Sequence, residues 1–268
     1  MALLYSEDTE ILIGCLMNVH NDIGPGLAES IYQEGCETEF SSKAISFESQ
    51  VSNWVIHRGA KVKELVPDFV MGNKIILDLK AIFGSFPPAA YTQIINYCKL
   101  FHMDLGILVN FGMQSLSWKR VPYTQKTGPI EIHGIECRER LPIRKDTLFQ
   151  TISQVFEKVL AFHGLGYTDE IYAGILMIEF GHVGLHATNG PTIRPVFQGS
   201  CQKETNIPVI VVEGKYPIYV SSLRKTIPAA ILARMQTYTK FLALPYGIIA
   251  NFGNDRLQIE CVASRTRS

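Results

Sequence analysis

The sequence is short of the features that would set it apart from ordinary globular proteins. No run of 18 apolar residues occurs, so we expect no membrane-spanning segment and no membrane partner. The first ten residues, MALLYSEDTE, lack a basic group and turn acidic at once, which predicts no secretory signal peptide. The six cysteines form neither a C-x-x-C pair nor a zinc-ligand spacing, so we expect reduced thiols in an intracellular protein, cytoplasmic or nuclear.

An excess of charge of one sign is also missing, because 25 basic and 25 acidic residues cancel. Bulk charge therefore gives no support for nucleic-acid binding. The balance hides an asymmetry: residues 1–134 hold 10 basic and 14 acidic residues, and the remainder holds 15 and 11. We find no Rossmann fingerprint, no P-loop and no serine-histidine-aspartate signature to favour enzymes of those classes.

The chain repeats itself. Residues 24–40 (GPGLAESIYQEGCETEF) and 164–180 (GLGYTDEIYAGILMIEF) align without gaps at an offset of 140. Residues 93–112 and 234–253 match at an offset of 141, and both blocks end in NFG. Two matched blocks in the same order predict two copies of one domain. We place them at residues 1–125 and 147–268, with a linker at 126–146 that is rich in turn-forming and charged residues.

Each copy predicts the same succession of elements. An amphipathic helix comes first, followed by a glycine-containing turn and a second helix. Short strands follow, and a helix near residues 88–102 and a strand at 106–112 close the first copy. The chain has 268 residues, 47% of them hydrophobic, which is enough for two cores. The fold class is therefore α/β, with a mixed central sheet flanked by helices in each copy.

One stretch of the first copy, VPDFVMGNKIILDLKAIFG at residues 66–84, carries charges where a buried strand would not. Asp68 follows a proline, and Asp78 and Lys80 interrupt an apolar run. Two facing strands can place Asp68 beside Asp78, and alternation puts Asp78 and Lys80 on one face. Such charges are costly in a core unless something pairs with them, so this hairpin is a candidate site.

Two carboxylates that converge repel each other unless a cation joins them. A hard divalent ion, Mg²⁺ or Mn²⁺, accepts two carboxylates, a backbone carbonyl such as that of Leu79, and waters. Lys80 can then position or help deprotonate a water molecule, an arrangement that suits hydrolysis of a phosphodiester. Glu29 on an early helix can supply a third carboxylate. Gln93 and Tyr97, four residues apart on a later helix, can orient the lysine, the water or a phosphate.

These residues carry a resemblance to a known family. The spacing D-x9-D-x-K after Pro67 resembles the PD-(D/E)xK nuclease superfamily, and QIINY at 93–97 resembles the QxxxY motif of its RecB-like branch. The run HNDIGPGLAESIY at 20–32 is similar to the signature of GxxExxY proteins within that superfamily. The resemblance implies two tandem restriction-endonuclease-like domains. It implies metal ligation by Glu29, Asp68 and Asp78, a catalytic role for Lys80, and accessory roles for Gln93 and Tyr97.

The second copy departs from this pattern, and two alignments of its middle are open. At a constant offset of 141, Asp78 and Lys80 fall on Tyr219 and Ser221, and the site is gone. The alternative matches IILDLK to IVVEGK at 210–215, which puts Glu213 and Lys215 in their places and Val196 in the place of Asp68. Asp169 replaces Glu29, and Arg234 replaces Gln93. Either way the second copy predicts an inactive or degenerate site.

Two functions from different classes follow. The first is a metal-dependent nuclease, active in the first copy and supported by the second. The alternative is a non-catalytic nucleic-acid-binding or assembly protein that keeps the fold. We expect nucleic acid as the partner, with DNA favoured over RNA, and zero net charge leaves room for a protein that delivers it. The chain is a monomer with an internal pseudo-dimer or a homodimer, and the sequence leaves both open.

Overall fold

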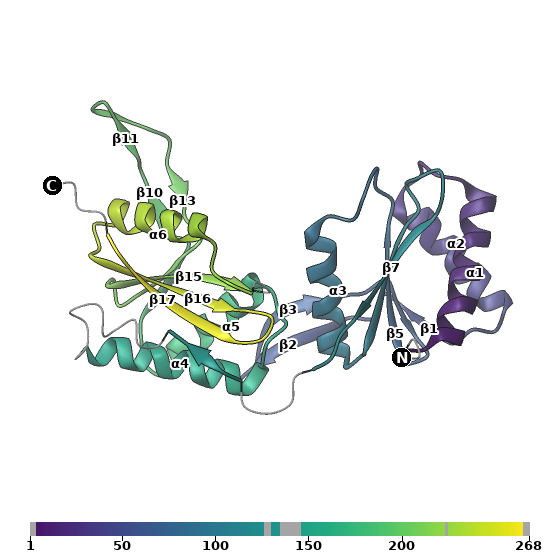
Figure 1. Cartoon of the computed structure of the whole chain (residues 1–268), viewed down its shortest axis with the longest axis horizontal. Helices are drawn as coiled ribbons and strands as arrows, with labels where there is room; N and C mark the ends of the chain where they lie inside the picture. Colours follow the sequence, from purple (N-terminus) through teal and green to yellow (C-terminus); the bar gives the residue numbers. More distant parts are fainter. Residues whose placement is uncertain (1–3, 126–129, 135–145, 223–224, 265–268) are drawn as a thin grey trace. The chain divides into compact units, whose positions relative to one another are not determined.

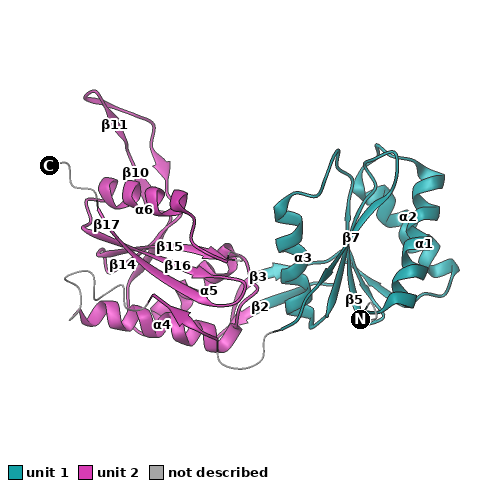
Figure 2. Cartoon of the chain, viewed as in Figure 1, with its two compact units in different colours: residues 1–55, 63–125 teal, residues 56–62, 126–268 magenta. Residues whose placement is uncertain are grey.

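The computed structural model describes residues 4–125, 130–134, 146–222 and 225–264, and it divides into two compact units. Unit 1 holds residues 1–55 and 63–125, and unit 2 holds residues 56–62 and 126–268 (Figure 2). The division differs from the predicted domains in one segment, because residues 56–62 belong to unit 2. Most of the predicted linker lies outside the described residues, and its strand β8 (Ile132–His133) belongs to the unit 2 sheet.

Unit 1 follows the predicted order of elements (Figure 1). Two helices come first, then short strands, then a third helix between the last long strands. The elements are α1 (Ser6–Ile23), α2 (Glu29–Ser42), β1 (Phe47–Ser49), β2 (Asn53–His57), β3 (Ala60–Leu65), β4 (Phe69–Met71), β5 (Ile75–Lys80), α3 (Pro88–Phe101), β6 (Leu105–Asn110) and β7 (Ser117–Pro122).

The unit 1 sheet has the order β1-β4-β5-β6-β7. Only the β5–β6 pair is parallel, and α3 provides the crossover between these two strands. Strands β4 and β5 form an antiparallel hairpin in which Phe69 pairs with Leu77. The sheet is therefore mixed, as the sequence predicts.

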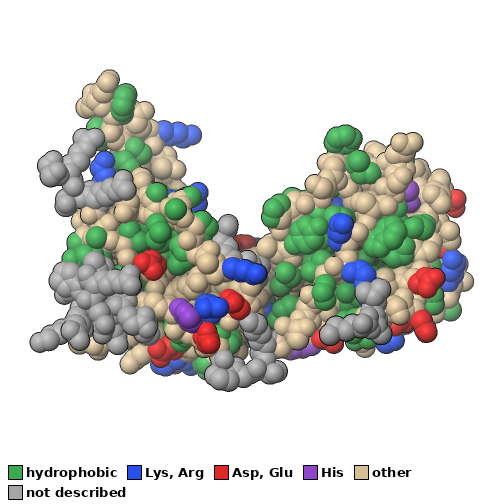
Figure 3. All heavy atoms as spheres, viewed as in Figure 1, with side chains coloured by type: hydrophobic (Ala, Val, Ile, Leu, Met, Phe, Trp, Pro, Cys, Tyr) green, Lys and Arg blue, Asp and Glu red, His purple; other side chains and the backbone are tan. Residues whose placement is uncertain are grey.

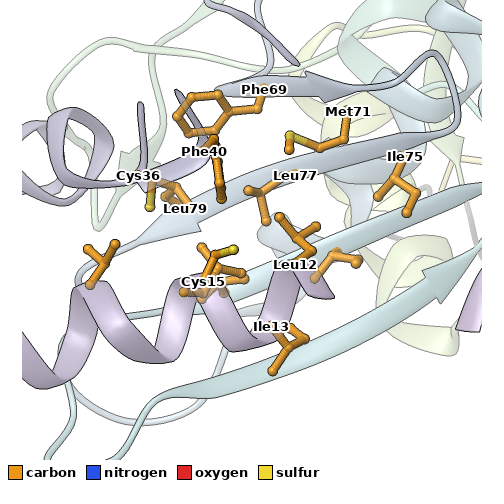
Figure 4. Packing of buried hydrophobic residues seen from close by; sticks show 14 of the residues in the cluster. Leu12, Ile13, Cys15, Cys36, Phe40, Phe69, Met71, Ile75, Leu77 and Leu79 are labelled. Carbon is orange, nitrogen blue, oxygen red and sulfur yellow. The ribbon is translucent and has the colours of Figure 1, made fainter. Parts of the chain in front are cut away.

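Alternation along β5 gives the strand two different faces. Leu77 and Leu79 point into a core that also contains Leu12 and Cys15 from α1 and Phe40 from α2 (Figure 4). The intervening residues of β5 face the other side of the sheet, which α3 covers. Burying the apolar face of β5 under α1 and α2 therefore fixes where its polar side chains must point.

Unit 2 repeats this plan. Its elements are α4 (Thr147–His163), α5 (Asp169–His182), β9 (Ala187–Asn189), β10 (Thr192–Ile193), β11 (Val196–Phe197), β12 (Ser200–Cys201), β13 (Thr205–Asn206), β14 (Ile210–Val212), β15 (Tyr216–Ser222), α6 (Ala229–Phe241), β16 (Tyr246–Phe252) and β17 (Leu257–Ala263). The sheet order is β8-β17-β16-β15-β14-β9, with β15 and β16 parallel. Strands β10 to β13 form a hairpin that projects away from this sheet (Figure 1).

The tyrosine of each repeated block closes the glycine turn between the first two helices. Tyr32 donates a hydrogen bond to the carbonyl of Gly24 at 2.8 Å and stacks on Phe111, with 4.6 Å between ring centroids. Tyr172 does the same with Gly164 at 2.6 Å and with Phe252 at 4.0 Å. These shared residues hold the fold together, which explains why they persist in both copies.

The expectation of reduced thiols is wrong at one position, since Cys261 is disulfide-bonded. Cys15, Cys36, Cys98 and Cys201 are free, and only Cys201 among them is exposed. Over the described part of the chain, no helix has the length and apolar character needed to cross a membrane.

Candidate active site

The β4–β5 hairpin brings Asp68 and Asp78 together. Asp68 directly precedes β4, and the pairing of Phe69 with Leu77 places Asp78 opposite it. The Oδ2 atom of Asp68 accepts a hydrogen bond from the backbone N–H of Leu79 at 2.6 Å. Its Oδ1 atom accepts another from Gln50 Nε2 at 3.0 Å. Asp68 therefore bridges the start of β4 to the end of β5, where the chemistry would take place.

Asp78 and Lys80 share the face of β5 that lies away from the α1–α2 core. Lys80 Nζ lies 2.7 Å from Asp78 Oδ2, and the aspartate side chain is only 3% exposed. At this distance the contact is a charge-assisted ion pair, and no other donor of the described residues reaches this buried oxygen. The buried carboxylate of Asp78 therefore depends on Lys80 for its stabilisation.

Glu29, the first residue of α2, faces the same group of charges. Burial raises the pKa of Glu29, the charge of Lys80 opposes that shift, and the charge of Asp68 adds to it. The backbone N–H of Ala81, directly after β5, also lowers the pKa. These influences place Glu29 beside the end of β5, so the three carboxylates and the lysine that the sequence predicted are neighbours.

The electrostatics of this group are those of carboxylates held together out of water. Burial raises the pKa of Asp78 to about 7, with Lys80 opposing the shift and Asp68 and Glu29 adding to it. Burial also raises the pKa of Asp68. Burial by itself would lower the pKa of Lys80. The attraction between Lys80 and Asp78 outweighs this effect, and the pKa of Lys80 is raised. The pKa values of all four groups are therefore raised, and perturbed pKa values of this kind occur at functional sites and in structural ion-pair networks.

Gln93 and Tyr97 lie on the sheet-facing side of α3. Gln93 Nε2 donates a hydrogen bond to the Tyr97 hydroxyl at 2.6 Å. Burial raises the pKa of Tyr97 to about 12, and the charges of Asp78, Asp68 and Glu29 contribute to that shift. The tyrosine therefore stays a neutral hydrogen-bonding group close to the carboxylates.

Two further residues support the site, and the sequence motifs do not identify them. Gln50 holds Asp68, as described above. The completely buried Asn110, at the end of β6, accepts from the N–H of Ile82 at 3.0 Å and donates to the carbonyls of Ile82 and Gly84 at 2.9 and 3.1 Å. It fixes the segment that follows Lys80. The NFG triplet shared by both copies was the signal for it.

The carboxylates of this group are the type of ligand that a hard divalent cation prefers. Three carboxylates carry oxygen ligands, and the buried Asp78 Oδ2 is reached by the Lys80 ammonium and by no other donor of the described residues. In the arrangement present Lys80 occupies that side, and its Nζ also donates to the Leu79 carbonyl at 2.8 Å. Among the described residues no three His, Cys, Asp or Glu side chains are arranged to hold a metal ion. Binding a cation therefore requires the Lys80 ammonium to move off Asp78 Oδ2.

The structure corrects the alignment that puts Glu213 and Lys215 in the places of Asp78 and Lys80. Both lie in the turn between β14 and β15, the counterpart of the turn between β4 and β5. Lys215 forms an ion pair with Asp146 at the start of α4, just as Lys74 pairs with Asp8 on α1 at 3.1 Å. Lys215 is therefore the counterpart of Lys74.

The strand register decides between the two alignments. Leu77 pairs with Ile107, and Ile218 pairs with Ile248, each at an offset of 141. Tyr219 and Ser221 therefore hold the positions of Asp78 and Lys80. The buried Val209, which follows Pro208, stands where Asp68 stands; Val196 lies instead in the projecting hairpin.

An arginine and two tyrosines occupy the corresponding place in unit 2. Arg234, in the position of Gln93, donates to the Tyr219 hydroxyl at 3.2 Å and lies 6.0 Å from the ring centroid. Tyr238, in the position of Tyr97, lies 6.5 Å from Tyr219 between ring centroids. Asp169, the counterpart of Glu29, begins α5. This site lacks both strand carboxylates and the lysine.

Comparison with protein families agrees with the fold. The family model described as PD-(D/E)XK nuclease superfamily matches residues 6–121 and again residues 146–262. Both matches span a whole α/β unit with its helices and mixed sheet. The chain therefore belongs to the PD-(D/E)XK nuclease superfamily and carries its domain twice.

More distant comparisons add little. No curated protein matches the sequence. Among solved structures, "Crystal structure of SSO0001" is similar at 14% identity, covering 53% of this chain and 72% of that chain with a TM-score of 0.31. Agreement at that level carries no argument about this protein.

Proposed function

We propose that this protein is a Mg²⁺- or Mn²⁺-dependent nuclease of the GxxExxY branch, with its active site in unit 1. The observation that carries the proposal is the group formed by Glu29, Asp68, Asp78 and Lys80. A nuclease accounts for their burial together, whereas the alternative, a non-catalytic binding or assembly protein, does not require it. The proposed substrate is nucleic acid inside the cell, DNA rather than RNA.

Each side chain has a chemical role that follows from its place. Asp68, Asp78 and Glu29 would hold the cation, together with the Leu79 carbonyl, and the bound cation would supply Lewis-acid stabilisation of the phosphate. Lys80, once displaced from Asp78, can donate to a phosphate oxygen or orient the attacking water. Tyr97 stays protonated at neutral pH, so with Gln93 it can donate a hydrogen bond.

Unit 2 is proposed to be catalytically inactive and to support substrate binding. Val209, Tyr219 and Ser221 offer no carboxylate or ammonium where hydrolysis would need them. Arg234 beside Tyr219 and Tyr238 instead combines a cation with aromatic faces. This combination binds phosphates and stacked bases in proteins that hold single strands. The basic surplus of residues 135–268 supports the same role.

Cleavage of varied DNA and RNA substrates with Mg²⁺ or Mn²⁺ tests the proposal. We expect Asp78→Ala and Lys80→Ala each to lower the cleavage rate by about 10²-fold or more, because each removes a group that stabilises the transition state. Chelation of the metal with EDTA should abolish cleavage. Mutants that cut as fast as the wild type, or a purified wild type that cuts no substrate, would contradict it.

Lys74→Ala is the matched control, since Lys74 lies in the turn of the same hairpin. It is half exposed, pairs with Asp8 on the surface and lies 5.9 Å from the ring centroid of Tyr5. We expect its cleavage rate to stay within about twofold of the wild type. A loss as large as that of Lys80→Ala would mean that the hairpin responds to any lost lysine, and the assignment of Lys80 would fail.

A further inference from the structure

The two copies carry the same hairpin, but the two tips have different surroundings. In each, the turn places two successive residues at positive φ: Arg58 at 49° with Gly59 at 78°, and Gln198 at 48° with Gly199 at 78°. The tips therefore correspond at an offset of 140. The first tip, residues 56–62, lies within unit 2 and touches α4 and α5. The second tip, at β11–β12, projects from unit 2 with hydrophobic side chains at its end (Figure 3).

The first tip is held by specific contacts. His57 Nε2 and Arg58 Nη2 bond to the carboxylate of Glu179 on α5, at 2.9 and 3.0 Å. His57 Nδ1 lies 2.9 Å from His163 Nε2 at the end of α4. The Arg58 guanidinium also lies 5.3 Å from the ring centroid of Phe162. This is a docked hairpin, with Glu179 as its buried anchor.

The docked tip coincides with a buried surface on α5. Ile171, Ile175 and Glu179, spaced four apart, are 1%, 0% and 0% exposed. We call them the covered stripe. The counterparts on α2 form an open stripe of Ile31, Gly35 and Glu39, in which Ile31 is 40% exposed and neither other residue is buried. Within the described residues, unit 1 therefore has the counterpart of the receiving surface with Ile31 exposed, and unit 2 has a second tip with Val196 and Phe197 exposed.

The substitutions between the two copies compensate one another across this contact. In the docked contact Arg58 supplies the cation for Glu179, and the residue four positions later, at the C-cap of α5, is the uncharged Val183. On the open stripe Lys43, the counterpart of Val183, already pairs with Glu39 at 2.8 Å. The second tip accordingly has Gln198, a neutral residue, in place of Arg58. If the second tip docked there, the carboxylate of Glu39 would become buried but would still be paired with Lys43.

The contact made by the residue before the turn also differs between the two copies. His57 meets His163 in the docked contact. Their counterparts are Phe197 on the second tip and Ile23 at the end of α1. A pair of histidines is therefore replaced by a pair of apolar side chains. Phe197 is 66% exposed, and Val196 beside it is 58% exposed. Docking would remove both side chains from water, which favours association through the hydrophobic effect.

We propose that the β11–β12 hairpin of one chain docks onto the α1–α2 surface of a second copy of this chain. The contact joins two different surfaces, so it forms either a reciprocal dimer with two such contacts or an open chain of copies. The occupant is a second copy because this chain's own α1–α2 surface carries the matched changes at Ile23, Glu39 and Lys43. The inference does not depend on catalysis.

Sedimentation equilibrium of the full chain between 1 and 100 µM tests the proposal. We expect the wild type to associate, and Phe197→Ser and Ile31→Asp each to weaken association by about tenfold or more. Phe83→Ser is the matched control, since Phe83 is 94% exposed in unit 1 and lies outside the proposed contact. Its association should equal that of the wild type. A mixture of the Phe197→Ser and Ile31→Asp chains should regain one contact per pair.

A cross-link locates the contact without relying on loss of association. Val62 packs against Gly174 so closely that a Cβ built there would lie 2.8 Å from Val62 Cγ1. The counterparts are Gln202 on the second hairpin and Glu34 on α2. In a Cys201→Ser background, Gln202→Cys with Glu34→Cys should form a disulfide between chains, and neither change alone should do so.

Three outcomes would overturn the proposal. They are a wild type that stays monomeric at 100 µM, association that Phe197→Ser leaves unchanged, and a double-cysteine chain that does not cross-link. A monomeric wild type whose affinity for DNA falls on Phe197→Ser would identify nucleic acid as the occupant of the hairpin and would likewise reject a second copy.

Discussion

At the scale of single residues, the second copy works as an internal control for the first. Val209 shows that the fold accepts a buried valine where Asp68 stands, and Tyr219 shows the same for Asp78. The acids in unit 1 are therefore not required by the strands that carry them. Their burial raises the pKa of both carboxyls, which is a cost that the folded unit carries.

Lys99 gives a prediction about pH at this scale. Burial lowers the pKa of this α3 lysine from 10.5 to about 7. Between pH 7 and pH 10.5 the unfolded chain therefore binds more protons at this position, so stability should rise with pH by at most about 1.4 kcal/mol per unit. We expect Lys99→Met to flatten the rise of the free energy of unfolding between pH 7 and pH 9, because methionine binds no proton in either state.

Urea unfolding at pH 7, 8 and 9 measures this effect. The control is Lys240→Met, because Lys240 is the exposed counterpart of Lys99 on α6. It should leave both the stability and its pH dependence almost unchanged. If Lys99→Met left the rise of stability with pH unchanged, the prediction would be wrong.

At the scale of elements, one close approach places α3 against β6. A Cβ on Gly106 would lie 2.5 Å from Ile94 Cγ1, and a Cβ on its counterpart Gly247 would lie 2.1 Å from Met235 Cε. In both copies a glycine lets the crossover helix lie on the central strand. This explains why the glycine is shared although the proposed catalytic residues are not.

Gly106→Ala should therefore push α3 away from the sheet and lower the free energy of unfolding by about 1–3 kcal/mol. Because Gln93 and Tyr97 lie on α3, cleavage should fall with it. Gly14→Ala is the control, since a Cβ at Gly14 on α1 meets no atom within 4 Å. We expect that change to be neutral or to stabilise by about 0.5–1 kcal/mol in chemical denaturation. Equal effects of the two would refute the steric explanation.

At the scale of the whole molecule, a contact between residues 122 positions apart ties the first hairpin into unit 2. His57 and Arg58 bond to Glu179, whose carboxylate is buried. The Arg58 hydrogen bonds, helped by His57, lower the pKa of Glu179 to about 2. The stabilisation from a carboxyl with a lowered pKa is complete above its unfolded value near 4.5 and is lost as pH falls through 2.

Glu179→Gln should therefore lower the free energy of unfolding at pH 7 by about 2 kcal/mol. This loss is smaller than the loss expected for a fully buried ion pair, because Arg58 is partly exposed. The difference from the wild type should shrink as pH falls below 4.5, which denaturation from pH 7 to pH 3 can follow. Glu39→Gln, which removes the surface counterpart, should have a much smaller effect. A constant difference across this range would show that charge is not the cause.

Much of this protein was accessible from its sequence, because repeated blocks and alternating apolar residues are local signals. The repeat, the helix and strand order, and the grouping of Asp68, Asp78 and Lys80 all follow from spacing and from burial of one face of a strand. Those local signals also left the second copy ambiguous. IVVEGK resembles IILDLK in letters, and only strand pairing shows that its charged residues form a turn.

The sequence by itself determined that two α/β copies exist and that the first keeps a complete set of acids and a lysine. The tertiary structure alone decided the register of the second copy, the supporting roles of Gln50 and Asn110, and the assignment of the 56–62 tip to unit 2. The physical reason is that these depend on hydrogen bonds and packing between segments distant in the chain. Such contacts leave no periodic pattern in the sequence, and so they become visible only once the chain is folded.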